Sequence, residues 1–178
     1  MKQTETLYCS TFETPAGPFS VAVNSAGAVV ATAFGGERSL GGRSRIANPV
    51  RDEARTAKAR GQVTGYFRSA STAFSLELAP RGTDFQKRVW AAMRAIPAGR
   101  TRSYGDIARE LGSSARAVGQ ASGANPICVI IPCHRVIGSD GSLTGFAFGE
   151  ATKRRLLDHE GAITQTSLPL VESQARKP

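Results

Sequence analysis

A single break in residue pattern, APRGTD at residues 79–84, divides this chain into two parts that favour different folds. Before the break, FSVAV at 19–23 alternates apolar and polar residues, and AVVATAF at 28–34 is almost continuously apolar, as in β-strands. After it, apolar residues recur at helical spacing. The pattern predicts a mixed fold of the α/β (α+β) class, with a small N-terminal sheet-plus-helix domain at 1–79, a mostly helical C-terminal domain at 80–161 and a flexible tail at 162–178.

Within the N-terminal part, residues 6–34 indicate strands, with a turn from Asn24 to Gly27. The Gly/Arg/Ser-rich segment FGGERSLGGRSR at 34–45 predicts an exposed loop. The composition becomes helical from about Pro49 to Phe67, and FSLEL at 74–78 returns to a strand pattern. We therefore expect strands, a helix and one further strand before the break.

Two capping patterns predict where helices begin in the C-terminal part. Thr83 and Gln86 have the spacing of a capping box, and the pattern is repeated by Ser103 and Asp106. The first of these helices has an apolar face formed by Phe85, Val89, Trp90, Met93 and Ile96.

The second helix and the one after it are short and close together. The helix with Ile107 and Leu111 should end at Gly112, and Ser113 or Ser114 should cap the next helix, ARAVGQASGA. Two short helices joined by so brief a turn favour a helix–turn–helix, with a recognition helix from residue 115. A plain pair of antiparallel helices would give the same pattern.

The net charge of +9 and an isoelectric point near 10.2 favour a polyanionic partner such as nucleic acid. Residues 1–83 carry ten Lys/Arg against six Asp/Glu, and residues 84–161 carry eleven against seven, an excess of four in each. The charge therefore does not locate a binding face, and solubility alone would explain it equally well. No apolar run approaches the roughly 20 residues that span a bilayer, and MKQTETLYCS lacks a secretory signal's apolar stretch. We expect a cytoplasmic protein with no membrane partner.

The cysteines, Cys9, Cys128 and Cys133, are odd in number and sparse, which argues against a disulfide framework. With only His134 and His159 as histidines, no set of zinc ligands has usable spacing. We expect neither a metal nor a cofactor.

The most informative stretch is NPICVIIPCHRVIGSDGSLTGF at 125–146. An apolar, strand-like run from Ile127 to Ile131 ends at Pro132, and Cys133 and His134 follow at once. A thiolate is a nucleophile, and a neighbouring histidine can take its proton, directly or through a water. Downstream, DHEG at 158–161 places Glu160 at a helix end, where it could orient the imidazole. The plainer interpretations are a buried inert cysteine and a solvated helix-end carboxylate.

The segment from Thr83 to Gly161 resembles the catalytic domain of the O6-alkylguanine-DNA alkyltransferases, the methylated-DNA–protein-cysteine methyltransferases. The motif PCHRV stands intact at 132–136, and FQKRVWAAMRAIPAGRTRSYGDIA is similar to the family's first helices. ARAVG is similar to its recognition helix, NP to the connection that follows, and HEG to its final helix. These motifs occur in the family's order and spacing, whereas the N-terminal half matches only in its pattern of strands, helix and strand.

The resemblance implies a catalytic set of four residues. Cys133 would accept the alkyl group, and His134 would act through a water as the base. Glu160 would hold His134, and Asn125 would tie the recognition helix to the active-site loop.

The resemblance also implies how DNA is bound. Arg116 would enter the duplex where the damaged base leaves, and Tyr104 would press on the phosphate beside the flipped nucleotide and help to hold the guanine. Further DNA contacts would come from Ala117, Ser122 and Arg135. By themselves, Arg116 and Tyr104 could equally be an exposed helix arginine and a half-buried packing residue. The recognition helix, rich in small residues, would lie in the minor groove and read no sequence.

The implied substrate pocket is lined by Tyr104, Val136, Phe146, Ala147 and Phe148, with the backbone carbonyls of Cys133 and Val136 accepting hydrogen bonds from the guanine edge. The family usually has an aromatic–small–Gly–Gly run here, often with tyrosine first. In this chain Phe146 lacks the hydroxyl and Phe148 is bulky where glycine is usual, which puts the acceptance of large adducts in question. The vertebrate-type zinc ligands are absent.

The implied activity is direct-reversal DNA repair, a single transfer of a methyl or other alkyl group from O6 of guanine, and from O4 of thymine, to Cys133. The expected partner is double-stranded DNA carrying O6-alkylguanine. The protein would be a monomer that could bind DNA cooperatively, associated with the nucleoid if bacterial. Three alternatives are a non-enzymatic relative that binds lesions, a sequence-specific regulator and a cysteine hydrolase. The relative would lack the acceptor cysteine, and the regulator would need more base-reading side chains.

Overall fold

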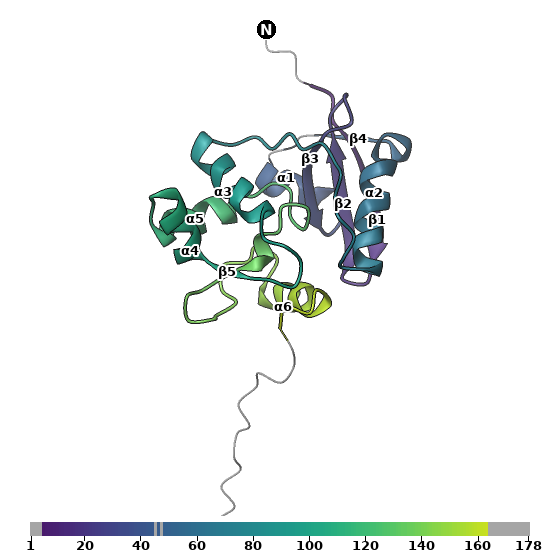
Figure 1. Ribbon diagram of the computed structural model, residues 1–178. Coiled ribbons are helices and arrows are strands. Elements are labelled where there is room, and N and C mark those ends of the chain that lie inside the picture. Colours follow the sequence, from purple (N-terminus) through teal and green to yellow (C-terminus); the bar gives the residue numbers. More distant parts are fainter. Residues whose placement is uncertain (1–4, 45, 47, 164–178) are drawn as a thin grey trace, which may run out of the picture.

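The N-terminal half (residues 5–79) is built on a four-stranded sheet, seen at the upper right of Figure 1. The computed structural model describes residues 5–44, 46 and 48–163. The strands lie in the order β3-β2-β1-β4, with β1–β2 and β2–β3 antiparallel and β1–β4 parallel. The strands are β1 (Tyr8–Thr14), β2 (Gly17–Val23), β3 (Val29–Phe34) and β4 (Val50–Arg51).

Each face of this sheet packs against a helix, because side chains alternate between the two faces of a strand. Phe19, Val21 and Val23 share a core with α2 (Glu53–Arg68), which lies along the sheet in Figure 1. The opposite face packs against α1 (Arg38–Ser44), whose Leu40 is 1% exposed. The prediction of an exposed loop at 34–45 is therefore wrong over the residues of α1. Small alanines on this face of the sheet leave room for the Leu40 side chain, and no local sequence pattern reveals that packing.

The outer edge of β3 is closed by two segments from later in the chain, which satisfies backbone groups that an edge strand would leave unpaired. Val29 exchanges hydrogen bonds with the backbone of residues 77 and 79, at 2.8 Å each. The predicted strand at 74–78 is thus reduced to a single bridge at Leu78. Farther along β3, Thr32 bonds to the segment at 126–128. Its backbone N–H donates to the carbonyl of residue 126, and its hydroxyl donates to the Cys128 carbonyl at 2.7 Å. The sheet therefore anchors the segment that leads to Cys133.

The C-terminal half (residues 80–163) is mostly helical, as predicted. Its elements are α3 (Asp84–Arg94), β5 (Arg102–Ser103), α4 (Tyr104–Leu111), α5 (Ala115–Gly123), a 3₁₀ turn (Cys133–Arg135), β6 (Val136–Ile137) and α6 (Glu150–His159). Both capping boxes are present, at Thr83 and at Ser103. Helix α4 ends at Gly112 in the left-handed conformation, and Ser114 caps α5, so the predicted pair of short helices is confirmed.

The two halves share one hydrophobic core. Phe19 and Val63 from the N-terminal half lie in the same buried cluster as Trp90, Ile107 and Ile131. The sheet and the helices therefore support each other, although the residue pattern separates them at 79–84. Of the predicted tail at 162–178, only residues 162 and 163 belong to the described part of the chain. No helix in the described ranges is both long and apolar enough to cross a bilayer.

Candidate active site

The segment before the cysteine is buried, but it is a turn and not the strand that its apolar run predicts. Ile131 N–H donates to the Ile127 carbonyl at 2.9 Å, and Val129 adopts a φ of 71°. A β-branched residue in this region is strained, at a cost of about 1–3 kcal/mol, and persists only where its surroundings hold it. Val129 is fully buried, so tertiary packing supplies that restraint.

Asn125 holds the two ends of this turn together. Its amide nitrogen donates to the Ile131 carbonyl at 2.9 Å, and its amide oxygen accepts from Ile127 N–H at 2.9 Å. Asn125 follows Ala124, the C-cap of α5, so one buried side chain joins the recognition helix to the turn that precedes Cys133. The part in catalysis that the resemblance implied for Asn125 stays a prediction.

Cys133 begins the 3₁₀ turn and is 8% exposed, and the next residue, His134, is fully buried. His134 Nε2 lies 2.7 Å from Glu160 Oε1. An ionised carboxylate only accepts hydrogen bonds, so Nε2 carries the proton and Nδ1 is the basic nitrogen. His134 Nδ1 has no hydrogen-bond partner among the described protein atoms. Burial lowers the pKa of His134, which keeps the ring neutral and able to accept a proton.

Glu160 is not solvated, because its side chain has no exposed surface. Burial would raise its pKa, but hydrogen bonds from His134, Arg135 and Tyr66 outweigh burial and lower the pKa to about 2. The carboxylate is therefore charged at all ordinary pH values and holds His134 in one orientation.

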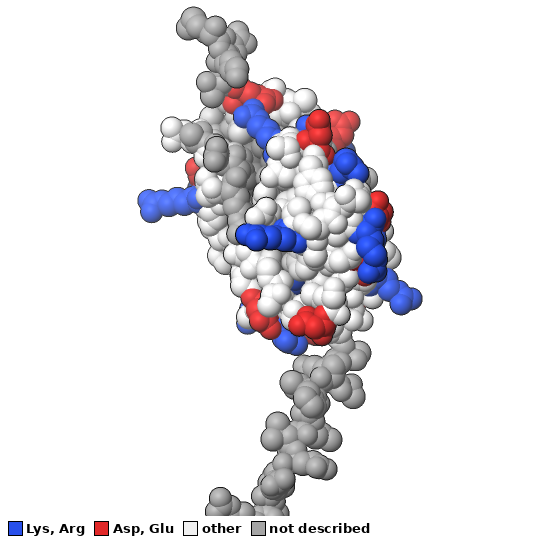
Figure 2. Space-filling model, turned by 90° about the vertical axis from the view of Figure 1, so that its left-hand side faces the viewer, with Lys and Arg blue, Asp and Glu red and all other residues white. Residues whose placement is uncertain are grey.

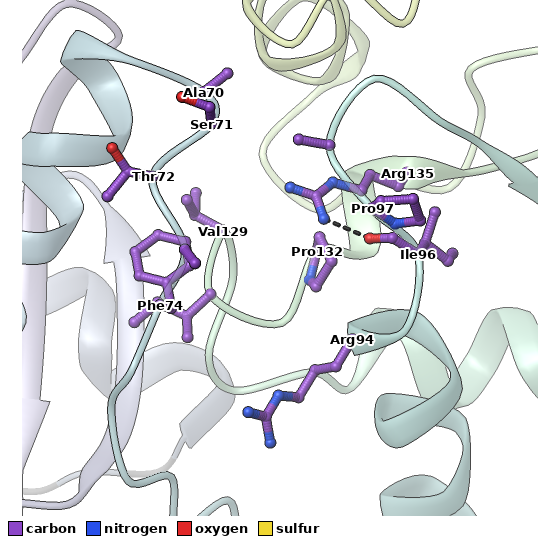
Figure 3. A pocket seen from close by; sticks show the side chains of 13 residues that line it. Ala70, Ser71, Thr72, Phe74, Arg94, Ile96, Pro97, Val129, Pro132 and Arg135 are labelled. Atoms are coloured by element: carbon purple, nitrogen blue, oxygen red, sulfur yellow. Dashed lines mark hydrogen bonds between the residues drawn. The ribbon is translucent and has the colours of Figure 1, made fainter.

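Arg135 belongs to this buried cluster and does not present itself to DNA. Its Nε and Nη2 donate to the Glu160 carboxylate at 2.9 Å each, and Nη1 donates to the Ile96 carbonyl at 2.5 Å. Figure 3 shows the guanidinium directed at that carbonyl. The predicted DNA contact is therefore wrong for Arg135, since its guanidinium is engaged inside the protein at each nitrogen.

A cavity of about 310 Å³ lies on this side of the cluster, and Figure 3 shows the side chains that line it. It lies between residues 70–74 of the N-terminal half and Arg94, Ile96, Pro97 and Pro132 of the C-terminal half. Cys133 is not among its lining residues, so this cavity is separate from the Cys133 sulfur.

Lys153 was missed by sequence reasoning. It is fully buried, and its Nζ donates to the carbonyls of Val136 at 2.5 Å and Thr144 at 3.1 Å. Burial lowers its pKa to about 8, opposed by the negative charge of Cys133. Lys153 precedes Leu156 by three residues and Leu157 by four, so it lies on the same buried face of α6. That spacing was the sequence signal that could have predicted its burial.

Tyr104 closes the other side of the site. It is half-buried at the start of α4, and its hydroxyl donates to the Thr144 carbonyl at 3.2 Å. Gly145 permits this approach, because a Cβ there would lie 2.6 Å from the Tyr104 hydroxyl. Burial, and then the charge of Cys133, raise the pKa of Tyr104. The Tyr104 hydroxyl thus interacts electrostatically with the Cys133 thiol.

The expected pocket residues 146–148 form an aromatic bridge to the sheet. The ring centroids of Phe146 and Phe148 are 5.7 Å apart, and those of Phe148 and Phe34 are 5.3 Å apart. Phe146 and Phe148 are half-buried, and Ala147 between them is exposed. Val136 is fully buried, and its carbonyl accepts from Lys153, while the Cys133 carbonyl accepts from Val136 N–H.

On α5, Arg116 is exposed and makes no hydrogen bond or ion pair with the described residues, and Ala117 is half-buried. Ser122 is 2% exposed and faces the interior, so the predicted DNA contact is wrong for this hydroxyl. Figure 2 views the molecule from the side of α3, α4 and α5: several Lys and Arg side chains project there, and acidic side chains lie toward its edges. No group of three potential metal ligands occurs in the part of the chain that the structure describes.

Two short helices with an exposed arginine, joined by Asn125 to a buried cysteine, histidine and carboxylate, form the arrangement expected of a DNA-binding domain with a nucleophilic thiol. Residues 84–162 match the family model described as the 6-O-methylguanine DNA methyltransferase DNA-binding domain. The chain belongs to the methylated-DNA–protein-cysteine methyltransferase family.

Two relatives and one solved structure carry this assignment. The methylated-DNA–protein-cysteine methyltransferase of Methanosarcina acetivorans is 41% identical over 161 residues, 88% of this chain and 99% of the relative. That of Mycobacterium bovis is 51% identical over 113 residues, 62% of this chain and 68% of the relative. The crystal structure of Mycobacterium tuberculosis OGT in complex with DNA is similar at a TM-score of 0.77 and 40% identity, covering 87% of this chain and 93% of that one.

Proposed function

We propose that this protein repairs alkylated DNA by moving a methyl or other small alkyl group from O6 of guanine, and from O4 of thymine, to Sγ of Cys133. The observation that carries the proposal is the His134–Glu160 contact of 2.7 Å immediately beside Cys133. A purely structural cysteine would need no such pair. The names of the relatives, which specify methylated DNA and a protein cysteine, support the same reaction.

In the proposed reaction, the Cys133 thiol gives its proton to Nδ1 of His134, through a water, and the thiolate attacks the alkyl carbon. The C–S bond forms as the C–O bond breaks, and the electron pair of that bond returns to the guanine. The guanine then takes up one proton in place of the alkyl group, and His134 gives up the proton that it received from the thiol, so that the protons balance. A thioether has no easy hydrolytic exit, so each protein molecule acts once.

The lesion lies inside the base stack, so the nucleotide must be flipped out, at a cost of a few kcal/mol. We propose that Arg116 fills the gap that the flipped nucleotide leaves in the duplex. Its side chain is exposed on α5 and has no partner among the described residues. Tyr104, at the start of α4 and bonded to the Thr144 carbonyl, would hold the flipped guanine near Cys133. Besides Arg116, the exposed residues of α5 are Ala115 and Gln120, so Gln120 is the one further exposed side chain of this helix that could read a base edge.

The pocket residues Val136, Phe146, Ala147 and Phe148 would surround the alkyl group. Because Phe148 packs between Phe146 and Phe34, we propose that small adducts are preferred. We further propose that the protein acts as a monomer on double-stranded DNA in the cytoplasm, at the nucleoid if the cell is bacterial. The net charge of +9 supports binding to phosphates, and Figure 2 shows Lys and Arg side chains projecting from the side of α3, α4 and α5, with acidic side chains among them.

Mass spectrometry of the intact protein tests the proposal directly. After incubation with duplex DNA containing O6-methylguanine, the protein should gain the mass of one CH₂, and peptide mapping should place it on Cys133. Cys133→Ala should gain nothing while still binding the duplex in a gel shift. A label on Cys9 or Cys128, or transfer retained by Cys133→Ala, would refute the assignment.

A further inference from the structure

The N-terminal half contributes a side chain to the buried cluster at the active site. Tyr66 lies on α2, 94 residues before Glu160, and its hydroxyl donates to Glu160 Oε1 at 2.7 Å. Burial, and then the charge of Glu160, raise the pKa of Tyr66, so the hydroxyl keeps its proton and remains a donor. The contact is fully enclosed, because both side chains are buried.

The ring of Tyr66 is held in place independently of its hydroxyl. It packs edge-on against Phe67 and His159, with ring centroids 5.2 Å apart in each case, and against Phe74 at 5.7 Å. Its backbone carbonyl accepts from His159 Nε2 at 2.7 Å. A phenylalanine would make the same packing contacts, so packing alone gives no reason for a buried hydroxyl at this position.

The hydroxyl bonds to the same carboxylate oxygen as His134. Glu160 Oε1 accepts from Tyr66, from His134 Nε2 and from Arg135 Nη2, whereas Oε2 accepts from Arg135 Nε. Each donor fixes the carboxylate and draws negative charge from the oxygen that faces the imidazole. The other charged or titratable groups around Tyr66, Glu160 and His134 are Cys133 and Arg135 on the active-site turn and Lys153 and His159 on α6.

From these contacts we propose that Tyr66 is a positioning residue for alkyl transfer: through Glu160, the N-terminal half sets the protonation of His134. The inference rests on the proposed transfer to Cys133. Without the hydroxyl, Oε1 holds more negative charge toward His134, and the pKa of the imidazole rises. A protonated His134 cannot take the Cys133 proton, so the loss should be large at low pH and should disappear at high pH.

The test is the single-turnover rate of methyl transfer to Cys133, measured across pH for the full-length protein and Tyr66→Phe. We expect the rising limb of the profile to move up by about half to one pH unit. Below the limb, transfer should be roughly 3- to 10-fold slower, whereas the plateau at high pH should match the wild type. Tyr8→Phe is the matched control, since it removes a tyrosine hydroxyl from the same half, where the ring packs under Arg55.

A second comparison shows whether Tyr66 acts through Glu160. In a double-mutant cycle with Glu160→Gln, Tyr66→Phe should cause no further shift of the profile. Superimposable profiles of Tyr66→Phe and wild type, an equal slowing at every pH, or a full shift in the Gln background would each overturn the positioning role. Thermal unfolding confirms that both variants are folded at the assay temperature. No transfer by the wild-type protein would instead refute the proposed function, and the positioning role with it.

Discussion

Glu160 is the residue on which the polar contacts of the site converge, and its ionisation ties stability to pH. Its pKa is about 2 in the folded protein against an ordinary value of 4.5. A depressed folded pKa means that the stabilisation is complete above pH 4.5 and is lost as the pH falls toward 2. The contribution is roughly 3 kcal/mol at neutral pH.

We therefore expect the free energy of unfolding to fall as the pH decreases from 4.5 to 2, with a smaller fall in Glu160→Gln. Urea unfolding at a series of pH values measures both slopes. Exposed carboxylates contribute equally to the two proteins, so the difference between the slopes reports Glu160. Identical slopes would show that the carboxylate is not stabilised by its neighbours.

Arg116 is the exposed residue to which we assign the gap left by the extruded base. Flipping costs a few kcal/mol in a stacked duplex and much less in a single strand. If Arg116 recovers about 1–3 kcal/mol of that cost, Arg116→Ala should slow duplex repair roughly 5- to 150-fold and single-strand repair far less. Single-turnover rates on matched oligonucleotides at saturating protein give the comparison, and equal slowing would mean a simple backbone contact.

Phe148 is the bulky residue at the predicted pocket, and its packing against Phe34 fixes it in place. Phe148→Ala should raise the rate of benzyl transfer relative to methyl transfer, because it opens space beside Ala147. Competition between O6-benzylguanine and O6-methylguanine oligonucleotides measures this ratio. An unchanged ratio in Phe148→Ala would show that the ring does not limit the size of the adduct.

At the level of elements, the joint between α5 and the active-site turn depends on Asn125. Its amide makes two buried hydrogen bonds across a turn that contains the strained Val129. Asn125→Ala leaves a buried donor and a buried acceptor unpaired, at about 1–3 kcal/mol each. We expect a lower melting temperature together with slower transfer.

Asn125→Asp provides the matched variant, since it keeps the acceptor for Ile127 N–H but cannot donate to the Ile131 carbonyl. Its melting temperature, measured by calorimetry, and its transfer rate should both be lower than those of the wild type. Only Asn125→Ala loses both hydrogen bonds. Wild-type stability in Asn125→Ala would contradict the role of this side chain as the link.

At the level of the whole molecule, the net charge of +9 favours binding through phosphates. Affinity for undamaged duplex should therefore fall linearly with salt on a log–log scale, with little preference among sequences, because bound counterions are released. Fluorescence anisotropy with several unrelated duplexes at increasing salt tests this. A salt-independent affinity, or one strongly preferred operator-like sequence, would instead favour a regulator.

The sequence by itself determined the features that depend on near neighbours. The capping boxes at Thr83 and Ser103, the end of α4 at Gly112 and the Cys133–His134 pair follow from residues a few positions apart. Such patterns also sufficed to identify the family over the C-terminal half.

Only the tertiary structure decided the features that depend on distant segments. The Gly-rich segment around the buried Leu40 is a helix, and the apolar run at Val129 is a turn. The Arg135 side chain points inward and bonds to Glu160. None of these is encoded locally, because each one is set by residues distant in the sequence that pack against it or bond to it. The Tyr66–Glu160 contact spans 94 residues and forms only when the sheet and the helices share one core, which brings α2 beside α6.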